Sequence, residues 1–160
     1  MSNETPNSRQ PAIRIACAAD AASVHAIVDA AYRSYIPRIG KPPGPMLDNY
    51  AQRIADGQVW ILADTSGIVG ILVLEETADG LLLDNIAVAP GQQGKGHGRT
   101  LLEFAETQAK RRGWNEIQLY TNALMTENIA LYHRIGYLET VRVTEKGFDR
   151  VYMVKQLTAP

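Results

Sequence analysis

The fold of this chain is decided by one stretch, Leu83–Leu102, which reads LDNIAVAPGQQGKGHGRTLL. Its first part has the apolar character of a buried strand, and Pro90 ends that strand because proline cannot continue a sheet ladder. Four glycines follow within eight residues: Gly91, Gly94, Gly96 and Gly98. Leu101 and Leu102 then begin a helical pattern. The stretch therefore predicts a strand, a glycine-rich loop and a helix in direct succession.

The segments on either side of this stretch continue the pattern of strands and helices. Upstream we expect, in order, a strand at Ile13–Ile15, a helix at Ala21–Tyr32 capped by Asp20, an irregular segment at Tyr35–Pro45, a helix at Met46–Asp56, and strands at Val59–Ala63, Ile68–Leu74 and Leu81–Val88. Downstream we expect a helix at Thr100–Arg112, a strand at Ile117–Tyr120, a helix at Thr126–Arg134, and strands at Tyr137–Thr144 and Arg150–Lys155. The three strands before the glycines form an antiparallel meander. The crossover after them normally makes its two strands parallel.

The composition is that of a single globular domain. With 160 residues, 46% of them hydrophobic, the chain can form one core. We expect one domain over 12–158 after a disordered lead-in over 1–11. A net charge of -1 gives no basic excess for nucleic acid, and no apolar run is long enough to span a membrane. With one cysteine, Cys17, and three scattered histidines, we expect no disulfide, no metal site, a cytoplasmic location and a buried Cys17.

The glycine loop predicts a binding site for phosphate. Glycine allows a ligand to approach the backbone closely, and free N–H groups at a helix N-terminus attract anions. Two common phosphate motifs do not fit. A P-loop requires Ser or Thr after its lysine, but Gly96 follows Lys95. A dinucleotide fingerprint requires a third glycine where this chain has Arg99 or Leu101, and a meander does not precede it.

A second motif makes the interpretation of the loop more specific. Residues 83–102, together with the downstream stretch ALYHRIGY at 130–137, resemble the two signature motifs of the GNAT superfamily of N-acetyltransferases, in the family's order. The first signature, [Q/R]-x-x-G-x-[G/A], is matched by Gln93, Gly96 and Gly98. The resemblance extends over Ile13–Leu157. It implies an α/β (α+β) fold: a mixed, mostly antiparallel sheet of about six or seven strands, flanked by about four helices and splayed around an acyl-CoA cleft.

The resemblance implies acetyl-CoA as the acyl donor. In the family, the pantetheine arm lies along the splayed strand, where its partners here would be the backbones of Ile86, Ala87 and Val88. The pyrophosphate would be held by Gln93, Gly94, Lys95, Gly96, His97, Gly98 and Arg99. The family often has an asparagine on the arm at the position where this chain has Met125. Asn122 and Asn128 flank that position, and we take Asn128 as a candidate for the coenzyme and Asn122 for the acceptor.

Two side chains are candidates for the chemistry. Tyr132 aligns with the family's general acid, which protonates the coenzyme A thiolate as it leaves. An attacking amine must be neutral, and Asp84 is the nearest carboxylate to the one that relatives often carry on this strand. If the strand alternates regularly, Asp84 shares a face with Ile86 and Val88. A chain of waters could also remove the proton, and the other candidate carboxylates are Glu75, Glu76 and Glu116.

The expected acceptor is a primary amine in a small molecule, a peptide or a protein. In the family, the segment after the first helix lines the acceptor side, so Tyr35 and Arg38 join Asn122 as candidate contacts. We therefore expect an N-acetyltransferase that works by direct attack in a ternary complex. Many relatives pair, which leaves a homodimer open. The alternatives are a non-catalytic acyl-CoA sensor of the same fold and a nucleotide-binding protein of another fold.

Overall fold

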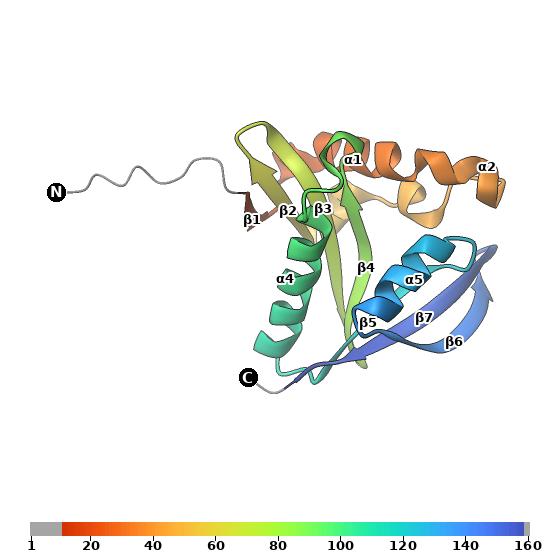
Figure 1. Cartoon of the computed structure of the whole chain (residues 1–160). Coiled ribbons are helices and arrows are strands. Elements are labelled where there is room, and N and C mark those ends of the chain that lie inside the picture. Colours follow the sequence, from red (N-terminus) through yellow and green to blue (C-terminus); the bar gives the residue numbers. More distant parts are fainter. Residues whose placement is uncertain (1–10, 159–160) are drawn as a thin grey trace.

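A seven-stranded sheet organises the chain, with the strand order β1-β2-β3-β4-β5-β7-β6 (Figure 1). The computed structural model describes residues 11–158, so the lead-in expected over 1–11 lies outside the described residues except for its last position. Every neighbouring pair of strands is antiparallel except β4 and β5, which are parallel as the crossover predicted. This mixed, mostly antiparallel sheet confirms the expected fold.

The sheet and its helices follow one another along the chain as expected. The strands are β1 (Ala12–Ile15), β2 (Val59–Asp64), β3 (Gly67–Thr77), β4 (Gly80–Val88), β5 (Glu116–Asn122), β6 (Leu138–Glu145) and β7 (Phe148–Gln156). The helices are α1 (Ala21–Tyr32), α2 (Ile36–Ile39), α3 (Tyr50–Ala55), α4 (His97–Arg111) and α5 (Thr126–Arg134). None of the helices in the described part of the chain is both long and apolar enough to cross a membrane.

Helices cover both faces of the sheet. On one face, Leu101 and Ala105 of α4 and Tyr132 of α5 pack into a core with the side chains of the central strands. On the other face, Val28 of α1 and Ile54 of α3 belong to a second core. These four helices, α1, α3, α4 and α5, bury apolar side chains against the sheet, and removing that area from water stabilises the fold by about 25 cal/mol per Å². The sheet therefore lies between two layers of helices, and a separation of two of its strands lies between these layers.

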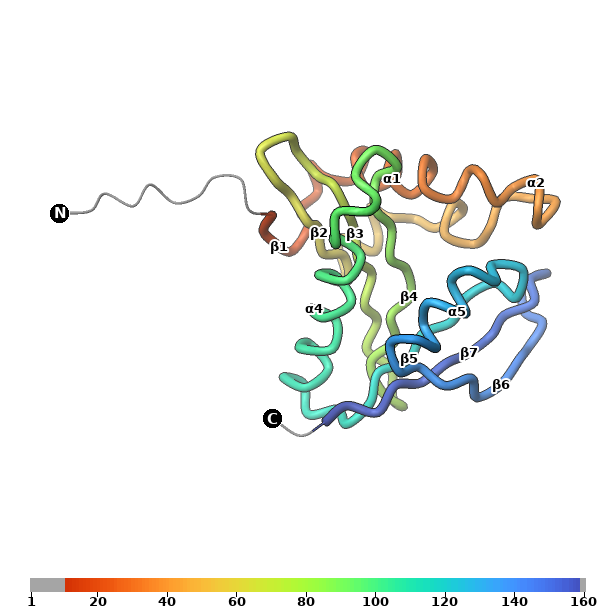
Figure 2. Tube along the Cα trace, in the orientation of Figure 1, coloured from red at the N-terminus to blue at the C-terminus, as the bar shows by residue number. Residues whose placement is uncertain are grey.

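Such an opening lies between β4 and β5. Leu81–Leu83 pair with Ile117–Leu119, and the pairing ends there although β4 continues to Val88 and β5 to Asn122. Figures 1 and 2 show the two strands together at one end of the sheet and apart at the other, with α5 beside the gap. Backbone groups on the separated part of β4 have no strand partner on that side, and such groups need another hydrogen-bonding partner.

The segment between α1 and α3 differs most from the sequence prediction. Its prolines and glycines indicated irregular backbone, yet α2 forms one helical turn with Pro37 in its first turn, where the missing N–H costs nothing. α3 begins at Tyr50 rather than at Met46 because Asn49 caps it. The Asn49 side chain accepts a hydrogen bond from the Gln52 N–H at 3.0 Å.

Two expectations near the start of the domain are wrong. Asp20 stands at the N-cap of α1 but makes no capping bond. Its carboxylate instead binds the Arg14 guanidinium at 2.8 and 3.0 Å and accepts a hydrogen bond from the Cys17 N–H at 2.8 Å. Cys17 lies in the exposed connection that follows β1 and is itself exposed rather than buried. The Asp20 side chain therefore pairs with Arg14, six residues earlier, instead of capping α1.

Candidate active site

A cleft of about 820 Å³ opens beside the glycine loop, along the separated part of β4. Its walls come from the end of β4, the loop before α4, one side of α4 and one side of α5. The loop residues that line it include Gln93, Gly94, Gly96, His97, Gly98 and Arg99. The α5 wall is formed by Asn128, Leu131 and Tyr132. The two sequence motifs, more than 20 residues apart in the chain, thus line one cleft.

The loop presents a row of free backbone N–H groups. None of the amides from 93 to 99 donates to another backbone group within residues 11–158, and the Thr100 N–H makes the first bond, to the Gly96 C=O at 3.1 Å. Gly94 and Gly96 adopt φ values of 80° and 83°, which only glycine takes without strain. Successive amides of this kind, at the positive end of a helix dipole, form a concave anion site. The loop therefore has the geometry to hold a pyrophosphate.

Gly98 has a different reason to be glycine. It lies inside α4, so its backbone conformation does not require glycine. A side-chain carbon at this position would meet only the Val88 Cγ2, at 3.9 Å, so the protein itself leaves room for one. Gly98 lines the cleft, however, and a methyl group there would stand between a ligand and the amides. Close approach of a ligand explains this glycine.

The charged side chains of the loop stay at its rim. Lys95 donates to the Gln92 side-chain oxygen at 3.1 Å, and Arg99 pairs with Glu103 at 3.0 Å while 85% of its side chain is exposed. His97 is buried at the start of α4, and its Nε2 has no hydrogen-bond partner within residues 11–158. The backbone, rather than these side chains, therefore shapes the anion site.

The end of β4 turns two of its amide groups toward the opening. The Ala89 N–H bonds to the Val69 C=O at 2.9 Å, on the β3 side. Because hydrogen-bonding direction alternates along a strand, Ala87 also pairs with β3, whereas Ile86 and Val88 point their N–H and C=O groups away from it. The outward N–H groups of Ile86 and Val88 are thus available to an extended ligand, whereas their C=O groups accept from the Tyr32 hydroxyl at 3.1 Å and from the Gln93 Nε2 at 3.5 Å. Ala87 lines the same cleft, but its amide belongs to the sheet.

A small inner cavity of about 40 Å³ lies between the cleft and the opposite side of the sheet. Three residues line both the cavity and the cleft: Ile86, Asn128 and Tyr132. On its other side the cavity adjoins a groove of about 570 Å³, with which it shares Gly44, Pro45, Asp84, Tyr120, Phe148 and Arg150. Two ligands, one in the cleft and one in the groove, could therefore meet at the cavity.

Tyr132 stands where the cleft and the cavity meet. Only 7% of this residue is exposed, and its ring packs edge-on against the Tyr137 ring, with 5.8 Å between the centroids. Burial raises the pKa of Tyr132 to about 12, with no contribution from a hydrogen bond. The phenol therefore keeps its proton over the physiological range and can donate a hydrogen bond to a developing anion.

Asp84 lies at an irregularity in β4. Val73 of β3 pairs with Asn85 and Leu74 pairs with Leu83, so Asp84 is an extra residue on β4, a β-bulge. Side chains alternate between the two faces of a strand, and one extra residue reverses the alternation beyond it. The bulge therefore decides the direction in which the Asp84 carboxylate points.

The expectation that Asp84 shares a face with Ile86 and Val88 is wrong. Leu83 before the bulge and Ile86 and Val88 after it all pack with the core under α4. Asp84 instead lines the groove on the opposite side, together with Leu82. The physical reason is the bulge, which periodicity in the sequence does not reveal. The carboxylate faces the cavity and the groove, on the side away from the glycine loop.

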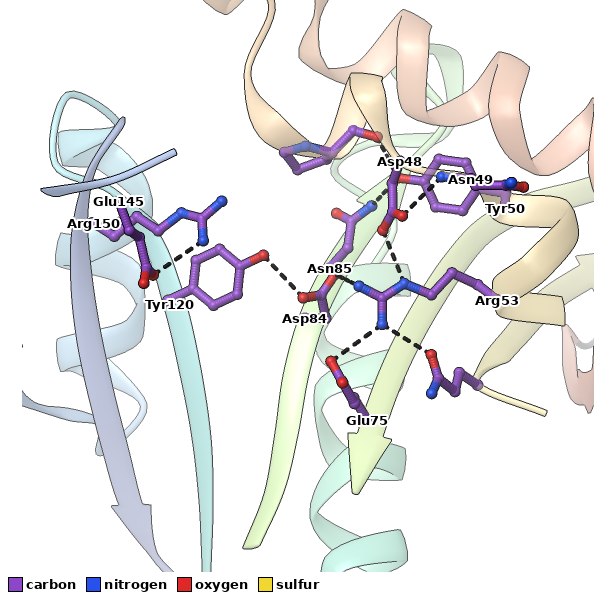
Figure 3. A network of polar contacts seen from close by, with 12 residues as sticks. Asp48, Asn49, Tyr50, Arg53, Glu75, Asp84, Asn85, Tyr120, Glu145 and Arg150 are labelled. Carbon is purple, nitrogen blue, oxygen red and sulfur yellow. Dashed lines mark hydrogen bonds and ion pairs between the residues drawn. The ribbon is translucent and has the colours of Figure 1, made fainter. Parts of the chain in front are cut away.

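A polar network surrounds this carboxylate (Figure 3). Only 9% of the Asp84 side chain is exposed; the Tyr120 hydroxyl donates to one of its oxygens at 2.9 Å, and the Arg53 Nη2 lies 3.3 Å from the other. Arg53 also pairs with Asp48 at 3.0 Å and with Glu75 at 3.2 Å. Burial raises the pKa of Asp84 above its usual range, and Arg53 and Tyr120 oppose that shift.

Asn85 ties the helices of one face to the separated end of β4. It is 3% exposed; its side-chain oxygen accepts from the Tyr32 hydroxyl at 2.7 Å, and its N–H donates to the Tyr50 hydroxyl at 3.0 Å. The Tyr32 hydroxyl also lies 3.1 Å from the Ile86 C=O. The contacts join α1, α3 and β4 where the sheet opens.

The Acetyltransferase (GNAT) domain family matches residues 55–139, a range that includes the glycine loop, the bulge in β4 and Tyr132. The chain belongs to the GNAT acetyltransferase family. The motif resemblance is thereby confirmed, and the cleft beside the loop is the candidate active site of a GNAT acetyltransferase. In the part of the chain that the structure describes, no group of three His, Cys, Asp or Glu side chains could hold a metal ion.

Relatives of this GNAT domain include acetyltransferases of different organisms. It is 32% identical over 90 residues to Probable N-acetyltransferase 14 of Xenopus tropicalis, covering 54% of this chain and 44% of that protein. It is 30% identical over 86 residues to streptothricin acetyltransferase of Streptomyces lavendulae, covering 52% and 46%. The matches thus span less than half the length of both relatives. The structure of PaiA N-acetyltransferase of Thermoplasma acidophilum in complex with coenzyme A has the same fold, with a TM-score of 0.74, 18% identity, and coverage of 92% of this chain and 99% of that one.

The residues predicted to contact the acceptor in this GNAT domain lie apart. Tyr35 lines the outer cleft rather than the groove. Arg38 lies over the Tyr35 ring, 5.2 Å from its centroid, and pairs with Glu127 of α5 at 2.7 Å, outside the linings of the three hollows described above. Asn122 lines the inner cavity, where its side-chain oxygen accepts the Leu124 N–H at 2.9 Å. Of the three, only Asn122 lines the cavity that adjoins the groove.

Asn128 is the flanking asparagine that reaches the coenzyme side of this GNAT domain. It lines both the cleft and the cavity, and its side-chain nitrogen lies 3.6 Å from the Met125 Sδ. Sequence reasoning missed Arg53, Tyr120 and Asn85. Asn85 alone carried a local signal, because a polar residue within an apolar strand must find a buried partner.

Proposed function

We propose that this chain is an N-acetyltransferase that transfers the acetyl group of acetyl-CoA to a primary amine by direct attack in a ternary complex. One observation carries the proposal. The cleft with the anion-binding loop and the groove with the buried carboxylate meet at one cavity, and Tyr132 lines its coenzyme side. A donor in the cleft and an amine in the groove would meet there, so no covalent acyl-enzyme is needed.

The donor side suits acetyl-CoA along its whole length. The free amides of residues 93–99 would hold the pyrophosphate. The outward N–H of Val88 would donate to a carbonyl of the pantetheine arm, and Ile86 and Asn128 lie on the same path toward the cavity. This path leads the thioester to Tyr132.

The reaction forms a C–N bond and breaks a C–S bond. As the amine attacks the thioester carbon, the outward N–H of Ile86, which lines the cavity with Tyr132, would stabilise the charge that develops on the carbonyl oxygen. The leaving sulfur would accept a hydrogen bond from the Tyr132 hydroxyl and gain its proton through it, and the phenol would regain a proton from water. The nitrogen loses its extra proton to Asp84, directly or through water. Tyr132 and Asp84 lie on opposite sides of the cavity's path, as donor of one proton and acceptor of the other require.

The names of the relatives support nitrogen as the acceptor atom. Two of the three proteins named above are called N-acetyltransferases, and the third is called streptothricin acetyltransferase. We therefore assign the acceptor to the class of primary amines. The cytoplasmic location and a homodimer stay predictions from the sequence.

An acetylation screen tests the proposal. The full chain is incubated with acetyl-CoA and a panel of small diamines, amino acids, and peptides that offer a free N-terminus or a lysine. We expect amine-dependent release of coenzyme A and an acetylated product in the mass spectrum. Parallel reactions without protein remove spontaneous acetylation. Binding of coenzyme A without product from any amine would favour the sensor, and tighter binding of NAD or ATP would contradict both functions.

A further inference from the structure

The Asp84 carboxylate occupies a place where a negative charge is costly. Only 9% of the side chain is exposed, and burial disfavours the ionised form of a carboxyl group. A proton acceptor must nevertheless be ionised when the amine attacks. If Asp84 has the role proposed above, other groups must keep it charged and directed toward the amine.

We propose that Arg53 and Tyr120 are the positioning residues that hold the Asp84 carboxylate ionised at the mouth of the acceptor path. The inference rests on the proposed function of Asp84. Neither residue is placed on the substrates; both act through this carboxylate. Figure 3 shows them on opposite sides of Asp84, Arg53 extending from α3 and Tyr120 from β5.

The two contacts stand at the point where the sheet divides. The last backbone pair of β4 and β5 joins Leu83 to Leu119, and the next residue of each strand is Asp84 and Tyr120. The Tyr120 hydroxyl donates across the gap to Asp84 at 2.9 Å, so a side-chain bond follows where the backbone ladder ends. The Arg53 Nη2 contacts the other carboxylate oxygen at 3.3 Å. Both oxygens are thus held, which fixes the orientation of the carboxylate.

The charge on Asp84 depends on the Arg53 guanidinium, which favours the ionised carboxylate, and on neighbouring acidic groups, which oppose it. The charged and titratable groups near Asp84 come from every neighbouring element: Arg53 and Tyr50 of α3, Asp48 before it, Glu75 of β3, Tyr32 of α1, Tyr120 of β5, and Arg150 of β7 with its partner Glu145. After burial, which raises the pKa of Asp84, Arg53 is the strongest influence and lowers it. Asp48 and Glu75 raise it. Removing Arg53 or Glu75 should therefore move the titration in opposite directions.

A pair that served only to anchor α3 would differ in its link to the reaction. A guanidinium 3.3 Å from a carboxylate stabilises the charged form whatever its role, so the titration shows whether Arg53 keeps Asp84 ionised. If Arg53 only anchored α3, the acid limb of kcat/KM would not follow that titration. The titration can be read without any catalysis, so it tests the inference separately from the proposed function.

The experiment is a carbon-13 NMR titration of the full chain with labelled aspartate carboxyl groups. Asp84→Asn identifies the resonance. We expect Arg53→Gln to raise the titration midpoint by about one pH unit or more, Arg53→Lys to raise it less, and Glu75→Gln to lower it. Tyr120→Phe should raise it through the lost hydrogen bond. Arg112→Gln is the matched control, because 28% of the Arg112 side chain is exposed, against 20% for Arg53, and it pairs with Glu76 at 3.5 Å rather than with Asp84.

Kinetics then connect the titration to the reaction. In wild type and variants, the acid limb of kcat/KM for the amine should follow the NMR midpoint, and Arg53→Gln should lose about tenfold in kcat/KM below the shifted midpoint. An unchanged midpoint in Arg53→Gln overturns the inference. If that variant does not fold, unchanged midpoints in Arg53→Lys and Glu75→Gln overturn it. If the midpoints shift but the Asp84→Asn variant turns over as fast as wild type, Arg53 and Tyr120 control the charge of Asp84 as inferred. In that case Asp84 is not the proton acceptor.

Discussion

At the scale of single residues, Tyr132 and Tyr137 are both buried tyrosines, but their surroundings differ. Tyr132 lines the cleft and the cavity, whereas the buried Tyr137 hydroxyl has no partner within residues 11–158 and Tyr137 lines none of the three hollows described above. We expect Tyr132→Phe to lower kcat by about 10²–10⁴-fold with little change in the KM for acetyl-CoA, because only proton donation to the thiolate is lost. Steady-state kinetics measure both.

Tyr137→Phe is the control for this prediction. Removing a buried hydroxyl that has no partner should leave activity unchanged and should not destabilise the fold. If Tyr132→Phe and Tyr137→Phe turn over equally fast, Tyr132 is not the general acid.

The element that decides coenzyme binding is the glycine loop with the first turn of α4. Gly98→Ala should keep or slightly raise stability, by about 0.5–1 kcal/mol for a glycine inside a helix, yet weaken coenzyme A binding by tenfold or more. Gly91→Ala is the matched control, since Gly91 has open space and does not line the cleft. Calorimetric binding and thermal unfolding of both variants test this prediction. Equal affinity of the two variants for coenzyme A would show that the ligand does not bind at the loop.

At the scale of the whole molecule, the sheet is two parts joined through three residue pairs of β4 and β5. A coenzyme bound along β4, the loop and α5 would add a second connection between these parts. We expect coenzyme A at about 100 times its dissociation constant to raise the free energy of unfolding by about 2.7 kcal/mol. The melting temperature should rise by roughly 5–11 °C in a chain of this size. Pantetheine, which lacks the pyrophosphate, should give a smaller shift at equal concentration, and equal shifts would argue against the loop as a phosphate site.

Local patterns predicted the elements well where periodicity and turn residues agreed. α1 and α5 have the expected bounds, and the crossover from β4 to β5 is parallel as expected. The bounds differed where a long-range or capping contact intervened, as at Asn49, which starts α3 four residues later than expected. Asp20 likewise forms an ion pair with Arg14 instead of capping the helix that it precedes.

The sequence by itself determined the loop, its family and the tyrosine of the downstream motif, because glycines, a strand and a helix in fixed order are local properties of the chain. The tertiary structure alone decided which way Asp84 points and what surrounds it. A bulge depends on how two strands pair, and Arg53 and Tyr120 reach Asp84 from elements 31 and 36 residues away in the chain. Periodicity describes one strand at a time, whereas the environment of a buried carboxylate is set by several elements at once.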